Sequence, residues 1–246
     1  MLAKDNRMAL FMRIAAIILL LSLIMTALCD AAFYIGRELT YHPLTNGIKY
    51  LTRYKFDVIR LLDLLQGQVI PIVTALIEVC TTLVVVIMLF AAKEKPAGVT
   101  IIISAALVYA GKILAEIIEV FLFIKRYGFG FQVLFNSVKS AAEYTAVLVL
   151  MILLGLLLIG VFKKASKVVG FILLGLFVVV WLVNSFYFVR NIGGLFSITK
   201  PTVFNVMSAI INRLLLPVCT GMNYIAYALL SLGAALRKRT PAVAAE

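Results

Sequence analysis

Three ionisable side chains interrupt one long apolar stretch of the sequence, and they are its most chemically informative feature. Lys112, Glu116 and Glu119 lie within residues 99–124, which are otherwise almost entirely apolar. Charged side chains are costly inside a lipid bilayer and are tolerated only beside a partner or water. Spacings of four and three residues place all three on one side of an α-helix. We therefore expect this side to face the interior of a helical bundle.

Glu78, in the preceding apolar stretch, is the expected partner of Lys112. A short charged turn, Lys93–Pro96, separates the two stretches, so they should form an antiparallel helical hairpin. Glu78 and Lys112 each lie 17 residues from Lys95, at the centre of that turn. Because a helix rises by about 1.5 Å per residue, equal separations give equal depths in the membrane. The sequence therefore predicts an ion pair between Glu78 and Lys112.

Arg213, in the last apolar stretch, is the fifth candidate residue of this site. If that stretch forms one helix, Arg213 and Glu116 lie at similar depths and can meet. The set then contains three acids and two bases, so one carboxylate is either protonated or available to bind a cation or a proton. This pattern favours a transporter-like or channel-like membrane protein, or the membrane subunit of such a system, that acts on an ion or a small molecule.

The same charges have a second interpretation that involves no substrate. Hydrophobic attraction between helices is weak in lipid, so membrane bundles use ion pairs and polar side chains to hold their helices together. The charges would then be structural clamps in a non-catalytic scaffold or assembly subunit. A transport site needs water-accessible space beside the acids, whereas clamps should be closed and fully paired. That difference separates the two hypotheses.

The composition indicates which elements position these residues. Hydrophobic residues make up 64% of the 246 residues and charged residues 14%, whereas a soluble domain has ~25% charged residues. Six apolar stretches approach or exceed the ~20 residues that a helix needs to cross a bilayer. They are residues 8–29, 69–92, 99–124, 144–162, 168–189 and 203–236. We predict an all-α polytopic membrane protein with a single membrane domain, a bundle of six transmembrane helices.

Two segments do not fit the simple pattern of upright spans. Residues 48–66 carry apolar residues at helical spacing with Lys49 and Arg53 on another side, which is typical of an amphipathic helix in the membrane interface. Residues 203–236 would extend ~51 Å as one helix, beyond the ~30 Å of the hydrocarbon core. Pro217 leaves two alternatives open for this segment. It is either one long, kinked helix or a short outer piece followed by a separate span.

The formal net charge of +12 indicates anionic partners, and the placement of the basic residues narrows their class. These residues are scattered between the apolar stretches, without the aromatic and basic pattern of a nucleic-acid-binding sheet. We therefore expect the lipid bilayer, with anionic lipid at the basic loops, and no nucleic acid. The short segments that contain Lys93, Lys95 and Arg237 should be cytoplasmic by the positive-inside rule. Both termini are then on the cytoplasmic side of a cytoplasmic (inner) membrane.

No motif of a catalytic or metal site accompanies these features. The single histidine, His42, excludes an HExxH zinc site, and the three cysteines lack metal-type spacing. Asp30, Asp57 and Asp63 lie near the expected membrane boundaries, so no intramembrane aspartate pair is expected. Glycine-rich phosphate loops, a GxSxG elbow and an internal repeat are not evident. We predict a protein that is not an enzyme, with no catalytic residues, no metal and no cofactor.

Overall fold

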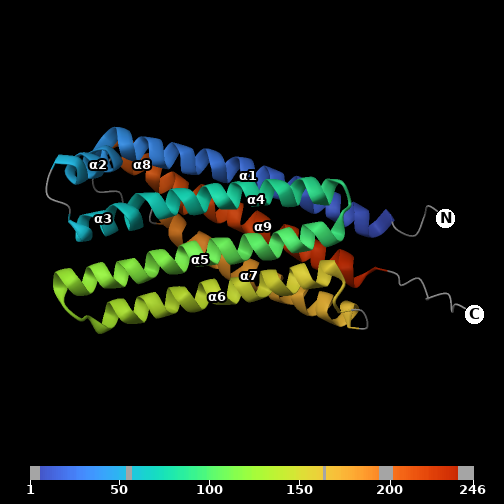
Figure 1. The fold of residues 1–246 in the computed structure, drawn as a ribbon. Helices are drawn as coiled ribbons and strands as arrows, with labels where there is room; N and C mark the ends of the chain where they lie inside the picture. Colours follow the sequence, from blue (N-terminus) through green and yellow to red (C-terminus); the bar gives the residue numbers. More distant parts are fainter. Residues whose placement is uncertain (1–5, 54–56, 163–164, 194–201, 238–246) are drawn as a thin grey trace, which may run out of the picture.

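The computed structural model describes residues 6–53, 57–162, 165–193 and 202–237, which are almost entirely helical and contain no strand (Figure 1). The elements in chain order are α1 (Asn6–Tyr41), α2 (Pro43–Arg53), α3 (Val58–Leu64), the π-helical turn η1 (Leu65–Val69), α4 (Ile70–Phe90), α5 (Glu94–Tyr127), α6 (Phe131–Ile159), α7 (Ser166–Ile192), α8 (Val203–Ile210), the π-helical turn η3 (Ile211–Leu215) and α9 (Leu216–Ala235). Six segments are long and apolar enough to span a membrane: Arg7–Tyr41, Val58–Phe90, Glu94–Tyr127, Phe131–Ile159, Ser166–Ile192 and Val203–Ala235. The predicted all-α class and six candidate spans are confirmed.

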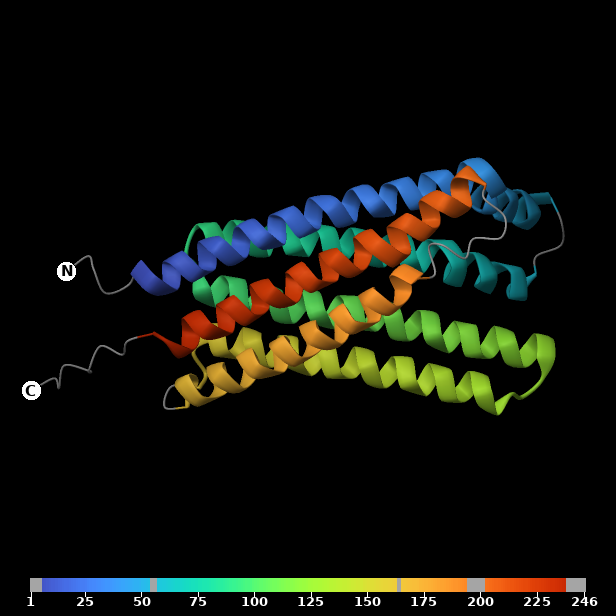
Figure 2. The same cartoon turned by 180° about the vertical axis from the view of Figure 1, so that it is seen from behind.

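The long helices follow one another around a ring. In order, α1 packs on α4, α4 on α5 and α5 on α6, while α7 packs on α9 and α9 returns to α1. The contact between α6 and α7 is the weakest in the ring, and the two helices diverge away from the turn that connects them (Figures 1 and 2). The ring is therefore closed most loosely between α6 and α7.

The apolar core lies toward the end of the ring at which α1 begins and α9 ends, an arrangement of helices that Figure 2 shows. All six long helices contribute to it, with Leu19, Leu89, Ile101, Leu158, Phe177 and Leu230 among its fully buried members. Glycines allow close packing there: a Cβ atom added to Gly98 of α5 would lie 2.5 Å from the Gly155 carbonyl oxygen of α6. Small residues at helix contacts are the usual means of tight packing in membrane bundles. The helices are consequently sealed together at the terminal end.

The last apolar segment is one continuous helical element, Val203–Ala235, which decides between the two predicted alternatives. The π turn η3 joins α8 to α9 directly before Pro217, and η1 joins α3 to α4 directly before Pro71. Proline cannot donate the usual helical hydrogen bond, and a wider π turn accommodates the disruption. The two prolines lie in similar sequences, IPIVTA at 70–75 and LPVCTG at 216–221. The two segments share the proline and the threonine three residues after it.

The predicted amphipathic helix over 48–66 is instead two helices, α2 and α3, whose intervening residues 54–56 lie outside the described part. His42 adopts a positive φ of 49° and ends α1. The Glu38 carboxylate then accepts hydrogen bonds from the backbone N–H groups of Leu44 (2.9 Å) and Thr45 (3.0 Å). A carboxylate at a helix N-terminus satisfies N–H groups that have no partner within the helix. Helix α2 therefore begins at Pro43, before the predicted boundary.

Both ends of the described chain and the α4–α5 turn lie at one end of the bundle (Figure 1). An ion pair between Arg237 and Glu94, 2.7 Å apart, joins the residues after α9 to the first turn of α5. At the opposite end, Arg126 of α5 pairs with Asp63 of α3. The long helices thus alternate in direction, and the ends of the bundle are tied by surface charges.

Candidate functional site

Lys112, Glu116 and Glu119 lie on the inner side of α5. The outer side of this helix carries exposed apolar residues, including Ile103, Leu107, Leu114, Ile117 and Phe121. Two hydroxyl pairs mark the flanks of α5: Ser104 with Thr81 of α4 at 2.7 Å, and Tyr109 with Thr145 of α6 at 3.2 Å. Because successive helical residues turn by ~100°, the three charges lie between these flanks and opposite the apolar stripe. They therefore point toward the middle of the ring.

The inner side of α5 is sealed at one end of the ring and accessible at the other. Ile101, Lys112 and Glu119 share this side, because they are separated by about whole numbers of helical turns. Ile101 is 2% exposed within the core, whereas Lys112 and Glu119 are exposed. Glu78 and Glu116 are part-buried. None of these four predicted site residues is therefore fully buried among the described helices.

The predicted ion pair between Glu78 and Lys112 does not form. The reason is the register of the α4–α5 hairpin. Thr81 pairs with Ser104, so residue 78 lies level with residue 107 on α5, five residues before Lys112. Five residues correspond to about 7.5 Å along a helix. Helix α5 begins at Glu94, so the turn is centred nearer residue 92 than Lys95.

The charges on α5 lie instead beside α6 and η1. The Lys112 Nζ atom is 5.3 Å from the centroid of the Tyr144 ring, a cation–π arrangement. Gln66 of η1 donates a hydrogen bond to Glu119 at 3.3 Å. Lys112 and Glu119 therefore contact different neighbours, α6 and η1 respectively.

Arg213 is part-buried in η3, on a different side of the ring. The last helix packs mainly on α1 and α7, whereas α5 packs mainly on α4 and α6. No ion pair joins Arg213 to Glu116 in the described part of the chain. The predicted contact between Arg213 and Glu116 is therefore not an ion pair.

A different pair of acids shares a small polar pocket between α1, α4 and α9. Asp30 of α1 and Glu78 of α4 both line it. The complete lining is Ser22, Leu23, Thr26, Asp30, Ala75, Glu78, Val79, Thr82 and Asn223. Its volume is about 20 Å³, close to the space needed for one water-sized occupant. None of these nine lining residues is basic, so the two carboxylates have no counter-charge in the pocket.

Asn223 of α9 also lines this pocket. Its Oδ1 atom is buried and has no hydrogen-bond partner among the described residues. Ser22 already donates its hydroxyl to the Cys219 carbonyl at 3.0 Å, which joins α1 to α9 beside the pocket. Buried polar atoms without partners are rare in folded proteins and require an explanation. The pocket therefore combines two carboxylate side chains with an amide whose oxygen has no partner among the described residues.

Asp30 and Asn223 are not among the site residues predicted from the sequence. Asp30 was expected near a membrane boundary, but α1 continues to Tyr41 and places Asp30 well inside the helix. Ser22, Thr26 and Asp30 recur every four residues, a spacing that gives them one helical side. That polar stripe is the signal that could have identified the pocket.

The chain matches no protein-family model, no curated protein and no solved structure. Among the described residues, no three His, Cys, Asp or Glu side chains are grouped as metal ligands. The polar pocket, with its two carboxylates and no basic residue in its lining, is thus the best candidate for a functional site.

Proposed function

We propose that this chain is a transporter-like or channel-like membrane protein that binds a small cation or a proton in the polar pocket of Asp30 and Glu78. The observation that carries this proposal is the presence of two carboxylates in one pocket whose lining contains no base. Ionisable groups within membrane spans are expensive and are retained mainly where they bind, relay or pair. The positive charge that pairs with these two carboxylates must therefore come from a species that is not one of the lining residues.

The pocket's size and chemistry define the class of occupant. A volume of about 20 Å³ admits one water-sized species, so a larger organic substrate does not fit as the pocket stands. Carboxylate, amide and hydroxyl oxygens are ligands for hard cations, and carboxylates also take up protons. The proposed occupant is therefore a small inorganic cation, with Na⁺ as the probe used below, or a proton.

Access to the pocket is from the end of the ring opposite the termini. The inner side of α5 is exposed at that end, whereas the core seals the terminal end. In this proposal Glu116 and Glu119, on the inner side of α5, attract cations toward the interior of the ring. Arg213 is part-buried in η3 near the same end.

The sidedness follows from the basic residues at the terminal end. Lys93, Lys95 and Arg237 lie there, and the positive-inside rule makes this end cytoplasmic. These cations meet the anionic headgroups of the cytoplasmic leaflet. The pocket is then reached from the outer side of a cytoplasmic membrane, and no catalytic activity is part of the proposal.

The alternative is a scaffold or assembly subunit, and the interhelical hydrogen bonds favour it. Thr81 bonds Ser104, and Asn184 of α7 donates to the Pro217 carbonyl of α9 at 2.9 Å. Such bonds stabilise a bundle without moving a solute. A scaffold needs no exchangeable occupant in the polar pocket.

Flux through reconstituted vesicles separates the two functions. We expect purified wild type in phosphatidylethanolamine–phosphatidylglycerol vesicles to take up ²²Na⁺ or to dissipate a pH gradient, read by an internal dye. Asp30→Asn and Glu78→Gln should abolish that flux with thermal stability retained. Glu143→Gln is the matched control, because Glu143 is exposed on α6 and pairs with Lys139 at 3.8 Å. No flux above empty vesicles, or equal flux in wild type and both variants, would refute the proposed function in favour of a scaffold.

A further inference from the structure

The junction that leads into α4 recurs at the start of α9. Each junction is a five-residue π turn, one residue of the following helix and then a proline, and the corresponding residues lie 146 positions apart: 65 and 211, 69 and 215, and the prolines at 71 and 217. A side chain of the preceding long helix donates to a carbonyl at each junction, Arg37 of α1 to Gly67 (3.3 Å) and Asn184 of α7 to Pro217 (2.9 Å). In transporters, a pair of proline-interrupted helices in corresponding positions commonly flanks the binding site.

The polar pocket lies directly inward of these two junctions. Two of its lining residues, Glu78 of α4 and Asn223 of α9, follow the two prolines by seven and six residues. On α1, Arg37 follows Asp30 by seven residues, which is two helical turns, so both share one side of the helix ~10 Å apart along its axis. The hydrogen bond from Arg37 to the Gly67 carbonyl therefore closes the seam between α1 and α4 on the outer side of the pocket.

From this arrangement we propose that the junction of η1 and Pro71 is a hinge, held closed by Arg37, that admits a cation to the polar pocket from the outer side. The proposal rests on the transport function proposed above and adds a gate to it. When the bond to the Gly67 carbonyl breaks, α3 and η1 turn away from α1 about Pro71. In the closed state the Arg37 guanidinium also repels cations from this seam.

The surroundings of η1 permit this movement and give it a direction. A Cβ atom added to Gly67 meets nothing within 4 Å, so the π turn is not packed against a neighbour on that side. Toward α5, the segment is held by Gln66, which donates to Glu119 at 3.3 Å, and by the ion pair of Asp63 with Arg126. π turns and prolines are where helices bend. The seam toward α1 is therefore the one that opens.

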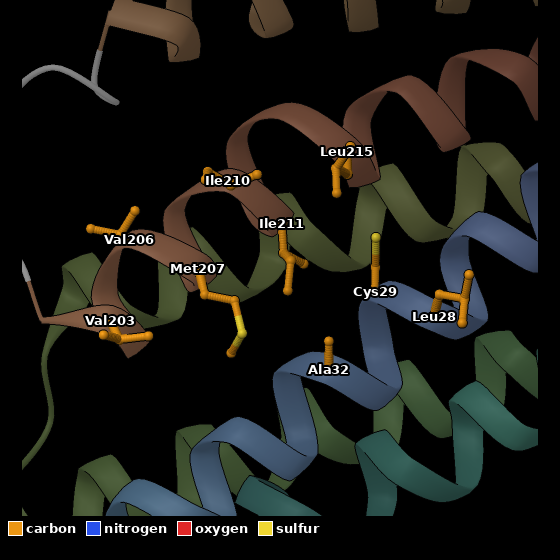
Figure 3. Close-up of a pocket in the computed structure, with 9 residues that line it drawn as sticks. All are labelled: Leu28, Cys29, Ala32, Val203, Val206, Met207, Ile210, Ile211 and Leu215. Atoms are coloured by element: carbon orange, nitrogen blue, oxygen red, sulfur yellow. The ribbon is translucent and has the colours of Figure 1, made fainter.

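The second junction also borders free space. An apolar groove of about 630 Å³ separates α1 from the α8–η3 segment, and Figure 3 shows Cys29 and Ile211 directed into it. The π turn η3 begins at Ile211 and ends at Leu215, and both residues line the groove. The segment before α9 thus has room to shift beside α1 when the first junction opens.

Cysteine labelling at the pocket tests the gate without relying on transport. In a background without the native cysteines, Thr26→Cys places a thiol in the pocket lining. The protein is held in lipid nanodiscs, where 2-aminoethyl methanethiosulfonate reaches both faces. We expect Arg37→Ala to raise the labelling rate at least fivefold. Arg60→Ala is the matched control, because it removes an exposed positive charge from α3, where Arg60 pairs with Asp57 at 3.4 Å, without touching the junction.

Pro71→Ala in the same background distinguishes a hinge from an effect of charge. Residue 71 then has an N–H group that can bond the Gly67 carbonyl, so the helix is continuous and the seam stays closed. Labelling of Arg37→Ala/Pro71→Ala should therefore return to within twofold of the rate without either change. Fast labelling in the double variant, or equal labelling with and without Arg37→Ala, would overturn the gate.

Pulsed electron–electron resonance covers the case in which Arg37→Ala fails to fold. Nitroxide labels are attached at Leu39→Cys of α1 and Val58→Cys of α3, which are both exposed positions, with Arg37 left in place. We expect two distance populations, of which the longer one disappears in Pro71→Ala. A single population that is identical in both proteins would show that the junction does not move.

The outcomes also separate this inference from the proposed function. If wild type carries cation flux in vesicles but Arg37→Ala leaves labelling and distances unchanged, the gate alone is refuted. If labelling responds to Arg37 and Pro71 as expected but no flux is found, transport is refuted. The hinge then still controls access to the polar pocket.

Discussion

The Arg37 guanidinium on α1 donates a hydrogen bond to the Gly67 carbonyl in η1, at 3.3 Å. In an uninterrupted α-helix that carbonyl would accept a bond from residue 71, but Pro71 has no N–H group. The side chain of one helix therefore satisfies a backbone group that proline leaves open in another. This bond fixes the outer half of α1 against the π turn that leads into α4.

A double-mutant cycle tests this relationship. Arg37→Ala should lower the free energy of unfolding by about 1 kcal/mol, because the Gly67 carbonyl loses its donor. In Arg37→Ala/Pro71→Ala the new N–H group of residue 71 can bond that carbonyl, so the loss should be smaller than the sum of the single losses. Unfolding in mixed detergent and dodecyl sulfate measures all three variants. Strict additivity would show that Arg37 does not compensate for the proline.

The glycine contact at the sealed end predicts a larger loss of stability. A Cβ atom at Gly98 would lie 2.5 Å from the Gly155 carbonyl oxygen, and one at Gly155 would lie 2.7 Å from the Gly98 carbonyl oxygen. Gly98→Ala or Gly155→Ala should therefore force α5 and α6 apart and cost on the order of 1–3 kcal/mol. Gly175→Ala on α7 is the control, since nothing lies within 4 Å of its added Cβ atom. Thermal unfolding that is unchanged in all three variants would contradict this packing.

The difference between the two ends of the ring predicts a pattern of chemical accessibility. In a background without the native cysteines, Glu119→Cys should react rapidly with a membrane-impermeant maleimide, because residue 119 is exposed on the inner side of α5. Ile101→Cys should react at least tenfold more slowly, because Ile101 lies in the core on the same side. Labelling of intact, sealed vesicles, followed by gel shift, measures both rates. Similar rates would mean that the core does not seal the terminal end.

The sequence predicts the spans well because the signal is physical and local. A run of apolar residues such as 168–189 has few alternatives to a membrane helix, and the structure places α7 over it. The inner side of α5 also follows from spacing alone, since three charges opposite an apolar stripe can face only the bundle. The positions of the helices and the side that each turns inward can thus be predicted from the short-range periodicity of the sequence.

Register and helix ends were not predictable in the same way. The expected pair of Glu78 and Lys112 fails because α5 starts at Glu94 and takes Lys95 and Pro96 into its first turn, where proline is tolerated. A shift of a few residues in the turn between α4 and α5 changes which residues of the two helices lie opposite each other. Asp30 was missed for a related reason, because α1 extends beyond the apolar run that defines it in the sequence.

Carbodiimide labelling tests the central claim most directly, because dicyclohexylcarbodiimide modifies protonated carboxyl groups in apolar surroundings. If Asp30 and Glu78 form an exchangeable site, peptide mass spectrometry should find the modification on one of them. Labelling should decline as the pH rises, and Na⁺ should protect where choline at equal concentration does not. Asp30→Asn should remove the Na⁺ protection at Glu78. Labelling that is absent at every pH, or insensitive to both pH and Na⁺, would contradict the account.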